Sequence, residues 1–162
     1  MSNKKTVLFV DDESSVLNTL KRLFRHEKYH VFTAISGTEG LKILDEMAVD
    51  LVISDQRMPH MNGVEFLQQV REKHPATARM IMSGYADIEA VINAVNMGSI
   101  CHFLTKPWDN DELKQIVCDY FINVFRSTAK IDEQNKISQQ LHLTVFEQKV
   151  EIDFLKDQLN HQ

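Results

Sequence analysis

Five short apolar segments, each followed by residues with helical spacing, limit most strongly the folds that this chain can adopt. The segments are residues 6–10 (TVLFV), 30–34 (HVFTA), 51–54 (LVIS), 79–83 (RMIMS) and 102–105 (HFLT). Apolar positions three and four residues apart follow each segment and indicate amphipathic helices. Near-continuous apolar strands between such helices are typical of a parallel sheet covered on both faces. The pattern therefore predicts an α/β fold built on a five-stranded parallel sheet.

Glycine and proline divide the chain into two parts. Gly98 is the last glycine and Pro107 the last proline, so residues 108–162 contain neither. The absence of both helix-breaking residues is typical of a long uninterrupted helix. We predict a globular domain over residues 1–123 and a helical extension over residues 124–162 that continues the last helix of the domain.

Charge and composition argue against several classes of protein. The formal net charge of -5 opposes non-specific binding to nucleic acid. No apolar run is long enough to span a bilayer, and charges interrupt the first apolar segment too early for a signal peptide. The spacing of Cys101 and Cys118 predicts neither a disulfide framework nor a zinc site. We expect a cytoplasmic protein that binds neither nucleic acid nor membranes.

Polar side chains stand where the predicted strands end, and they are Asp11, Asp12, Asp55, Ser83 and Lys106. The carboxyl ends of parallel strands share one edge of the sheet, so we expect these groups to meet in one crevice. Three carboxylates favour a hard divalent cation, Mg²⁺ above all, and an added lysine and hydroxyl favour phosphoryl chemistry. Asp55 is the best candidate for a nucleophile that carries an aspartyl phosphate, with Asp11 and Asp12 as a metal-binding pair. The alternative is that Asp55 is an ordinary turn residue.

Four motifs, VDDE, SDQRMP, MSGYAD and FLTKPW, occur in this order along the chain. Together they resemble the receiver domain of two-component response regulators, over roughly residues 4–126. The resemblance implies a doubly wound, flavodoxin-like sheet with strand order 2-1-3-4-5. Within the family, the sequence is most similar to receivers joined to cyclic-di-GMP phosphodiesterases of the HD-GYP type. The resemblance to receiver domains also implies a signalling domain that catalyses only its own phosphotransfer and slow dephosphorylation.

The resemblance also implies a role for each residue of the crevice. Asp55 would accept the phosphoryl group, Asp12 would bind Mg²⁺ directly, and Asp11 would bind it through water. Arg57 would give the metal its backbone carbonyl, which leaves its side chain free to vary. Lys106 would pair with the phosphoryl oxygens.

Two further residues match the positions that switch on phosphorylation in the family. Ser83 would be the hydroxyl that turns toward the phosphoryl group. Phe103 stands where the family has its switch aromatic, often tyrosine, and it keeps the ring without a hydroxyl. The peptide bond between Lys106 and Pro107 is expected to be cis. The signal would change the surface formed by the fourth helix, fifth strand and fifth helix.

A heptad pattern begins at Val117 and continues through the predicted extension. Its a positions are Val117, Val124, Ile131, Ser138, Val145, Ile152 and Leu159, and its d positions are Tyr120, Ser127, Gln134, Leu141, Gln148 and Leu155. The polar residues among them, Ser127, Gln134, Ser138 and Gln148, weaken the apolar seam. β-branched residues at a with leucine at d favour a parallel dimer, so we expect a coiled-coil homodimer through residues 124–162. A second apolar stripe lies outside these positions: Leu143, Phe146, Val150 and Phe154. The alternative is an amphipathic extension that folds back on the domain.

The resemblance therefore implies a receiver that takes a phosphoryl group from a sensor histidine kinase or phosphotransfer protein. It would relay the signal to an output domain or effector beyond this chain. One alternative is a dimeric scaffold that does not depend on phosphorylation. Another is an aspartate-nucleophile phosphatase of haloacid dehalogenase type, but those enzymes need a D-x-D spacing, whereas Asp11 and Asp12 are adjacent.

Overall fold

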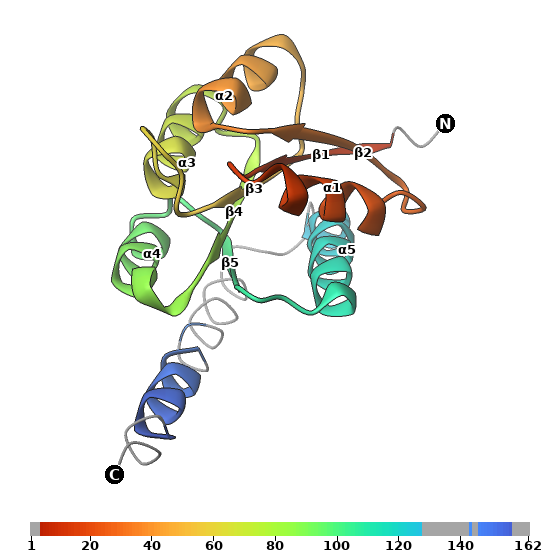
Figure 1. The fold of residues 1–162 in the computed structure, drawn as a ribbon. Helices are drawn as coiled ribbons and strands as arrows, with labels where there is room; N and C mark the ends of the chain where they lie inside the picture. The colour runs from red at the N-terminus through yellow and green to blue at the C-terminus, as the bar shows by residue number, and fades with distance from the viewer. Residues whose placement is uncertain (1–3, 128–142, 144–145, 157–162) are drawn as a thin grey trace. The chain divides into compact units, whose positions relative to one another are not determined.

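A computed structural model of the chain describes residues 4–127, 143 and 146–156 (Figure 1). The strands are β1 (Lys5–Val10), β2 (Tyr29–Ala34), β3 (Leu51–Asp55), β4 (Ala78–Ser83) and β5 (His102–Thr105). The helices are α1 (Ser14–Leu23), α2 (Gly37–Glu46), α3 (Gly63–Lys73), the 3-10 turn η1 (Tyr85–Asp87), α4 (Ile88–Asn96) and α5 (Asn110–Ser127). The chain divides into two compact units, Met1–Lys114 and Gln115–Gln162.

The five strands form one parallel sheet in the order β2-β1-β3-β4-β5. This is the doubly wound α/β order 2-1-3-4-5 that the motifs predicted. Val10 pairs with Ser54, so the next residues, Asp11 and Asp55, stand side by side where β1 and β3 end. Asp55 itself pairs with Met82 on β4. The register therefore brings the polar strand ends to one edge of the sheet.

Helices cover both faces of this sheet, with α1 on one face and α2, α3 and α4 on the other (Figure 1). Alternate strand residues point to opposite faces, so each strand contributes to both layers of the core. The layer beneath α2, α3 and α4 contains Leu8, Val10, Val52, Ile81, Leu41, Phe66, Leu67 and Val91. In the other layer the rings of Phe9 and Phe24 lie 5.2 Å apart. Each fully buried apolar side chain of this size contributes about 1.5–3 kcal/mol to stability.

Side chains cap the start of several helices. The Ser36 hydroxyl accepts a hydrogen bond at the start of α2, and Asn62 and Glu65 form a reciprocal capping box at the start of α3. The Asp109 carboxylate accepts two backbone hydrogen bonds in the first turn of α5. Asp87 holds the corresponding position before α4, yet within the described part of the chain its side chain makes no capping hydrogen bond.

Several boundaries differ slightly from the predicted ones. Strand β3 continues through Asp55, and the turn η1 before α4 was not predicted. The Lys106–Pro107 peptide bond is cis, as expected. Among the described helices, none has the length and apolar character needed to cross a membrane.

The predicted extension is described only in part. Residues 146–156 are helical. The heptad positions Ile131, Ser138, Leu141, Val145 and Leu159 lie outside the described residues. The coiled-coil dimer and the division at residues 123 and 124 therefore remain predictions.

Candidate functional site

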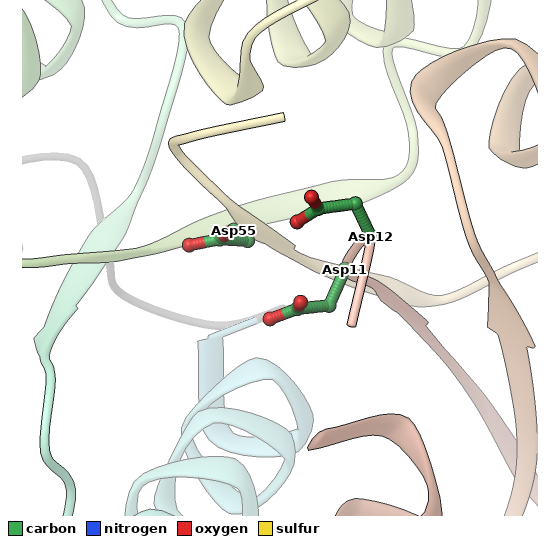
Figure 2. Close-up of side chains that lie close together, drawn as sticks. All are labelled: Asp11, Asp12 and Asp55. Carbon is green, nitrogen blue, oxygen red and sulfur yellow. The ribbon is translucent and has the colours of Figure 1, made fainter. Parts of the chain in front are cut away.

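Three carboxylates meet at the carboxyl edge of the sheet, and Figure 2 shows their side chains close together. Asp11 and Asp12 follow β1, and Asp55 ends β3. One oxygen from each lies within 4.8 Å of the others. Asp11 is fully buried and Asp55 is 6% exposed, whereas Asp12 is exposed to solvent. The site thus has two buried carboxylates, Asp11 and Asp55, and one carboxylate, Asp12, that faces solvent.

Lys106 balances part of this charge. Its Nζ lies 3.0 Å from Asp11 Oδ2 and 2.9 Å from Asp55 Oδ1. Residue 106 directly follows β5, so the cation reaches the carboxylates from the far side of β4. The strand ends therefore place one ammonium group between two carboxylates that would otherwise repel each other.

Burial and ion pairing act in opposite directions on the pKa of Asp55, and they also oppose each other at Lys106. Burial raises the pKa of Asp55 above its ordinary value of 3.8, and the hydrogen bond and charge of Lys106 oppose that rise. Burial alone would lower the pKa of Lys106, but its hydrogen bonds to Asp55 and Asp11 outweigh burial and raise it. Lys106 is therefore a permanent cation at neutral pH and favours the ionised form of Asp55.

A pocket of about 380 Å³ opens over these residues. Its walls are Asp12, Glu13, Asp55, Gln56, Arg57, Gly84, Tyr85, Ala86, Asp87 and Lys106. The lining comes from the ends of β1, β3, β4 and β5 and the loops that follow them. These segments are far apart in the sequence, and the fold brings them together. The volume suits a small phosphorylated molecule or an inserted side chain.

Two residues that the sequence did not single out hold the end of β3 against the start of α3. The buried Gln56 accepts hydrogen bonds from Gly63 N through its backbone oxygen and from Val64 N through Oε1, at 2.9 and 3.0 Å. Gly63 is required because a Cβ there would overlap the carbonyl oxygen of Asp55. The Asn-Gly pair at residues 62–63 marks a turn in the sequence, but only the fold shows what approaches it.

The resemblance gave a role only to the backbone carbonyl of Arg57, and in the structure its side chain also forms an ion pair. Its Nε lies 2.7 Å from Asp87 Oδ2 on the opposite loop. The hydrogen bond and charge of Asp87 raise the pKa of Arg57. The pair joins the loop after β3 to the turn before α4.

The two predicted switch residues are described as well. Ser83 is buried at the end of β4, and its hydroxyl donates to the carbonyl oxygen of Gly84 at 3.0 Å. Phe103 on β5 is partly buried and packs against the core beneath α4. In this arrangement the Ser83 hydroxyl is bonded locally, so it must rotate before it can serve a group on Asp55.

Comparison with known proteins gives matches over most of the chain. A family model described as the response regulator receiver domain matches residues 7–118. The hydrogenase transcriptional regulatory protein HoxA of Bradyrhizobium diazoefficiens is 39% identical over 136 residues, which are 82% of this chain and 28% of that protein. Sporulation initiation phosphotransferase F of Bacillus subtilis is 32% identical over 120 residues, 74% of this chain and 95% of that protein.

Solved structures give the same fold. The signal receiver domain of an HD domain-containing protein from Pseudomonas fluorescens Pf-5 superposes with a TM-score of 0.71 at 30% identity. The alignment covers 75% of this chain and 97% of that one. The matched region thus spans 28% of the HoxA protein, 95% of sporulation initiation phosphotransferase F and 97% of the solved receiver-domain chain.

Proposed function

Because this chain belongs to the response regulator receiver domain family, we propose that it accepts a phosphoryl group on Asp55 and relays that event to a partner. The observation that carries the proposal is the pairing of one lysine with two buried carboxylates at 2.9 and 3.0 Å, beside a third carboxylate. A structural ion pair needs one carboxylate. Here three carboxylates accompany one lysine at an open pocket, so two of them are available to bind a cation or to act as a nucleophile.

The residues divide the proposed reaction between them. A carboxylate oxygen of Asp55 attacks phosphorus, and the bond from phosphorus to the donor breaks, with the electron pair leaving on the donor. The donor would be the phosphohistidine of a sensor kinase or of a phosphotransfer protein. Lys106 holds Asp55 in place beforehand and then neutralises charge on the phosphoryl oxygens.

The carboxylates fit a magnesium ion. Ligand oxygens lie about 2.0–2.1 Å from Mg²⁺, so ligands on opposite sides of the ion lie about 4 Å apart. The separation of at most 4.8 Å needs only a small closing movement or a water on the Asp11 side. Asp12, Asp55 and the backbone carbonyl of Arg57 would hold the ion, with Asp11 behind a water. Bound Mg²⁺ would supply positive charge for the developing phosphoryl oxygens.

The wider setting of this function is also a proposal. Ser83 and Phe103 would carry the change to the surface formed by α4, β5 and α5. We infer a cytoplasmic protein that acts together with an output domain or effector outside this chain. The similarity to the receiver of an HD domain-containing protein favours an HD-GYP phosphodiesterase as that output.

Acetyl phosphate with Mg²⁺ tests the proposal without knowledge of the kinase. Intact mass should show a single phosphoryl adduct on the wild-type chain and none on Asp55→Asn or after removal of Mg²⁺. Asp45→Asn, which changes an aspartate outside the pocket, is the matched control and should label normally. Turnover of many phosphomonoesters would support a phosphatase instead, and no reaction would support a scaffold.

A further inference from the structure

The ion pair between Arg57 and Asp87 forms part of the lining of the acidic pocket. Both residues line the pocket, and they come from loops that follow different strands. The Arg57 side chain is 70% exposed, whereas that of Asp87 is 21% exposed. The pair therefore joins a solvent-exposed cation to a more enclosed carboxylate at the start of α4.

Asp87 stands at the N-cap position of α4 and does not cap the helix. Its backbone, with φ -113° and ψ 17°, is not extended because it is the last residue of η1. An N-cap aspartate normally has an extended backbone and accepts a hydrogen bond from the second or third helical amide, here Glu89 or Ala90. A strong capping residue is thus in place, with its carboxylate engaged by Arg57 instead.

Arg57 and Asp55 line the same pocket. After Asp87, the charge of Asp55 also favours the cationic form of Arg57 and so raises its pKa. A phosphoryl group on Asp55 would carry about -1.5 to -2 charges and three acceptor oxygens. Guanidinium binds phosphate through paired hydrogen bonds, so the phosphoryl group would compete with Asp87 for Arg57.

We propose that Arg57 is a second phosphoryl-binding side chain, held at rest by Asp87, and that its transfer to phosphorylated Asp55 frees Asp87 to cap α4. The inference rests on the proposed role of Asp55 as the acceptor. At rest, η1 is wound and Asp87 pairs with Arg57. In the switched state η1 unwinds, Asp87 becomes extended, and its carboxylate accepts from the amide of Glu89 or Ala90. The phosphoryl group shifts the balance because it contacts Arg57 in one state only.

Two substitutions of Asp87 separate its two roles. Asn caps helices as well as Asp does but cannot form the ion pair, whereas Ala can do neither. Amide hydrogen exchange of Glu89 and Ala90 is the readout, measured with and without Mg²⁺ and beryllofluoride, a phosphoryl mimic. Lys5→Gln is the matched control, because it removes the Lys5–Asp50 ion pair, which lies outside the pocket.

In the wild-type chain beryllofluoride should raise protection of these amides about fivefold, as expected for a gained cap. Asp87→Asn and Arg57→Gln should show the raised protection without beryllofluoride, because nothing holds the resting arrangement. Asp87→Ala should show it in neither state, and Lys5→Gln should behave as the wild-type chain does.

Two results would overturn the inference while leaving the proposed function intact. One is bound beryllofluoride, seen as changed amide signals around Gln56 and Lys106, with no change at Glu89 and Ala90. The other is an Asp87→Ala chain that responds as the wild type does. If the wild-type chain does not bind beryllofluoride at all, the proposed role of Asp55 fails and the inference fails with it.

Discussion

At the scale of single residues, Gly63 shows how closely the backbone approaches itself beside the site. A Cβ at this position would overlap the Asp55 carbonyl oxygen and lie 2.9 Å from the Cα of Gln56. Backbone atoms cannot move aside cheaply, so Gly63→Ala should lower the free energy of unfolding by about 2–4 kcal/mol. Urea unfolding measures this loss.

Gly84→Ala is the matched control for that substitution. A Cβ at Gly84 would meet nothing within 4 Å, and the residue has an ordinary negative φ of -79°. Its effect should stay within about 0.5 kcal/mol. Equal losses in the two variants would show that the contact with Asp55 does not matter.

Asp55 gives a prediction about pH. Burial raises its pKa above 3.8 in the folded protein, so the folded state binds the proton more tightly than the unfolded chain does. The free energy of unfolding therefore falls as the pH rises from the pKa of Asp55 in the unfolded chain to its higher pKa in the folded protein. In EDTA near pH 7, Asp55→Asn should be more stable than the wild type, and the gain should shrink below the pKa of Asp55 in the unfolded chain.

Urea unfolding across this pH range measures the difference. Asp111→Asn is the control, because the Asp111 side chain is 95% exposed. Loss of stability in Asp55→Asn at neutral pH would mean that the ion pair with Lys106 outweighs burial.

The sequence predicted the acidic residues and Lys106 because one rule, convergence of parallel strand ends, places them. That rule says nothing about contacts between loops. The Arg57–Asp87 pair depends on the approach of two loops that are far apart in the chain, and the hydrogen bonds of Gln56 to residues 63 and 64 depend on how the loop after β3 folds back on itself. Their side chains carry no local pattern that reveals such a contact, so they were found only in the fold.

At the scale of elements, the start of α3 depends on its capping box. Asn62 Oδ1 accepts from Glu65 N at 2.9 Å, and Glu65 Oε2 accepts from Asn62 N at 2.9 Å. Asn62→Ala removes the first bond and weakens the second, so it should cost about 1 kcal/mol of unfolding free energy. Denaturant unfolding provides the measurement.

Glu13 is the control for this substitution. It holds the N-cap position of α1 but makes no side-chain capping hydrogen bond there. Glu13→Ala should therefore change stability by less than about 0.5 kcal/mol. A similar loss in both variants would indicate that residue type, and not the capping bonds, sets the stability of these helix starts.

The strands were predictable because buried parallel strands contain apolar runs, such as residues 51–53 of β3 and residues 7–10 of β1. The turn η1 was not predictable, because its three residues, Tyr85–Asp87, carry no periodic pattern. Its position is instead fixed by contacts with the pocket, among them the ion pair of Asp87.

At the scale of the whole molecule, the predicted extension leaves apolar surface to be covered. In the helical residues 146–156, Ile152 is 51% exposed, Leu155 51% and Phe154 61%. Ile152 and Leu155 are the predicted a and d positions of one heptad. An isolated helix is marginal in water unless an apolar face is buried, so the face that carries Ile152 and Leu155 needs a partner. A second copy of the chain supplies one with the same pattern.

We therefore predict a parallel homodimer through residues 124–162, with both receiver domains at the same end. In a parallel pair Glu151 at position g meets Lys156 at position e of the partner helix, which favours this orientation. Cysteine at residue 152, in a chain whose own two cysteines, Cys101 and Cys118, are replaced by serine, should cross-link to its counterpart in most molecules. Non-reducing electrophoresis measures the yield, and a chain that stops after Arg126 should be monomeric and still accept a phosphoryl group. Efficient linking between cysteines at residues 131 and 159, with none at 152, would instead show an antiparallel pair, which could not carry a signal from two adjacent receivers.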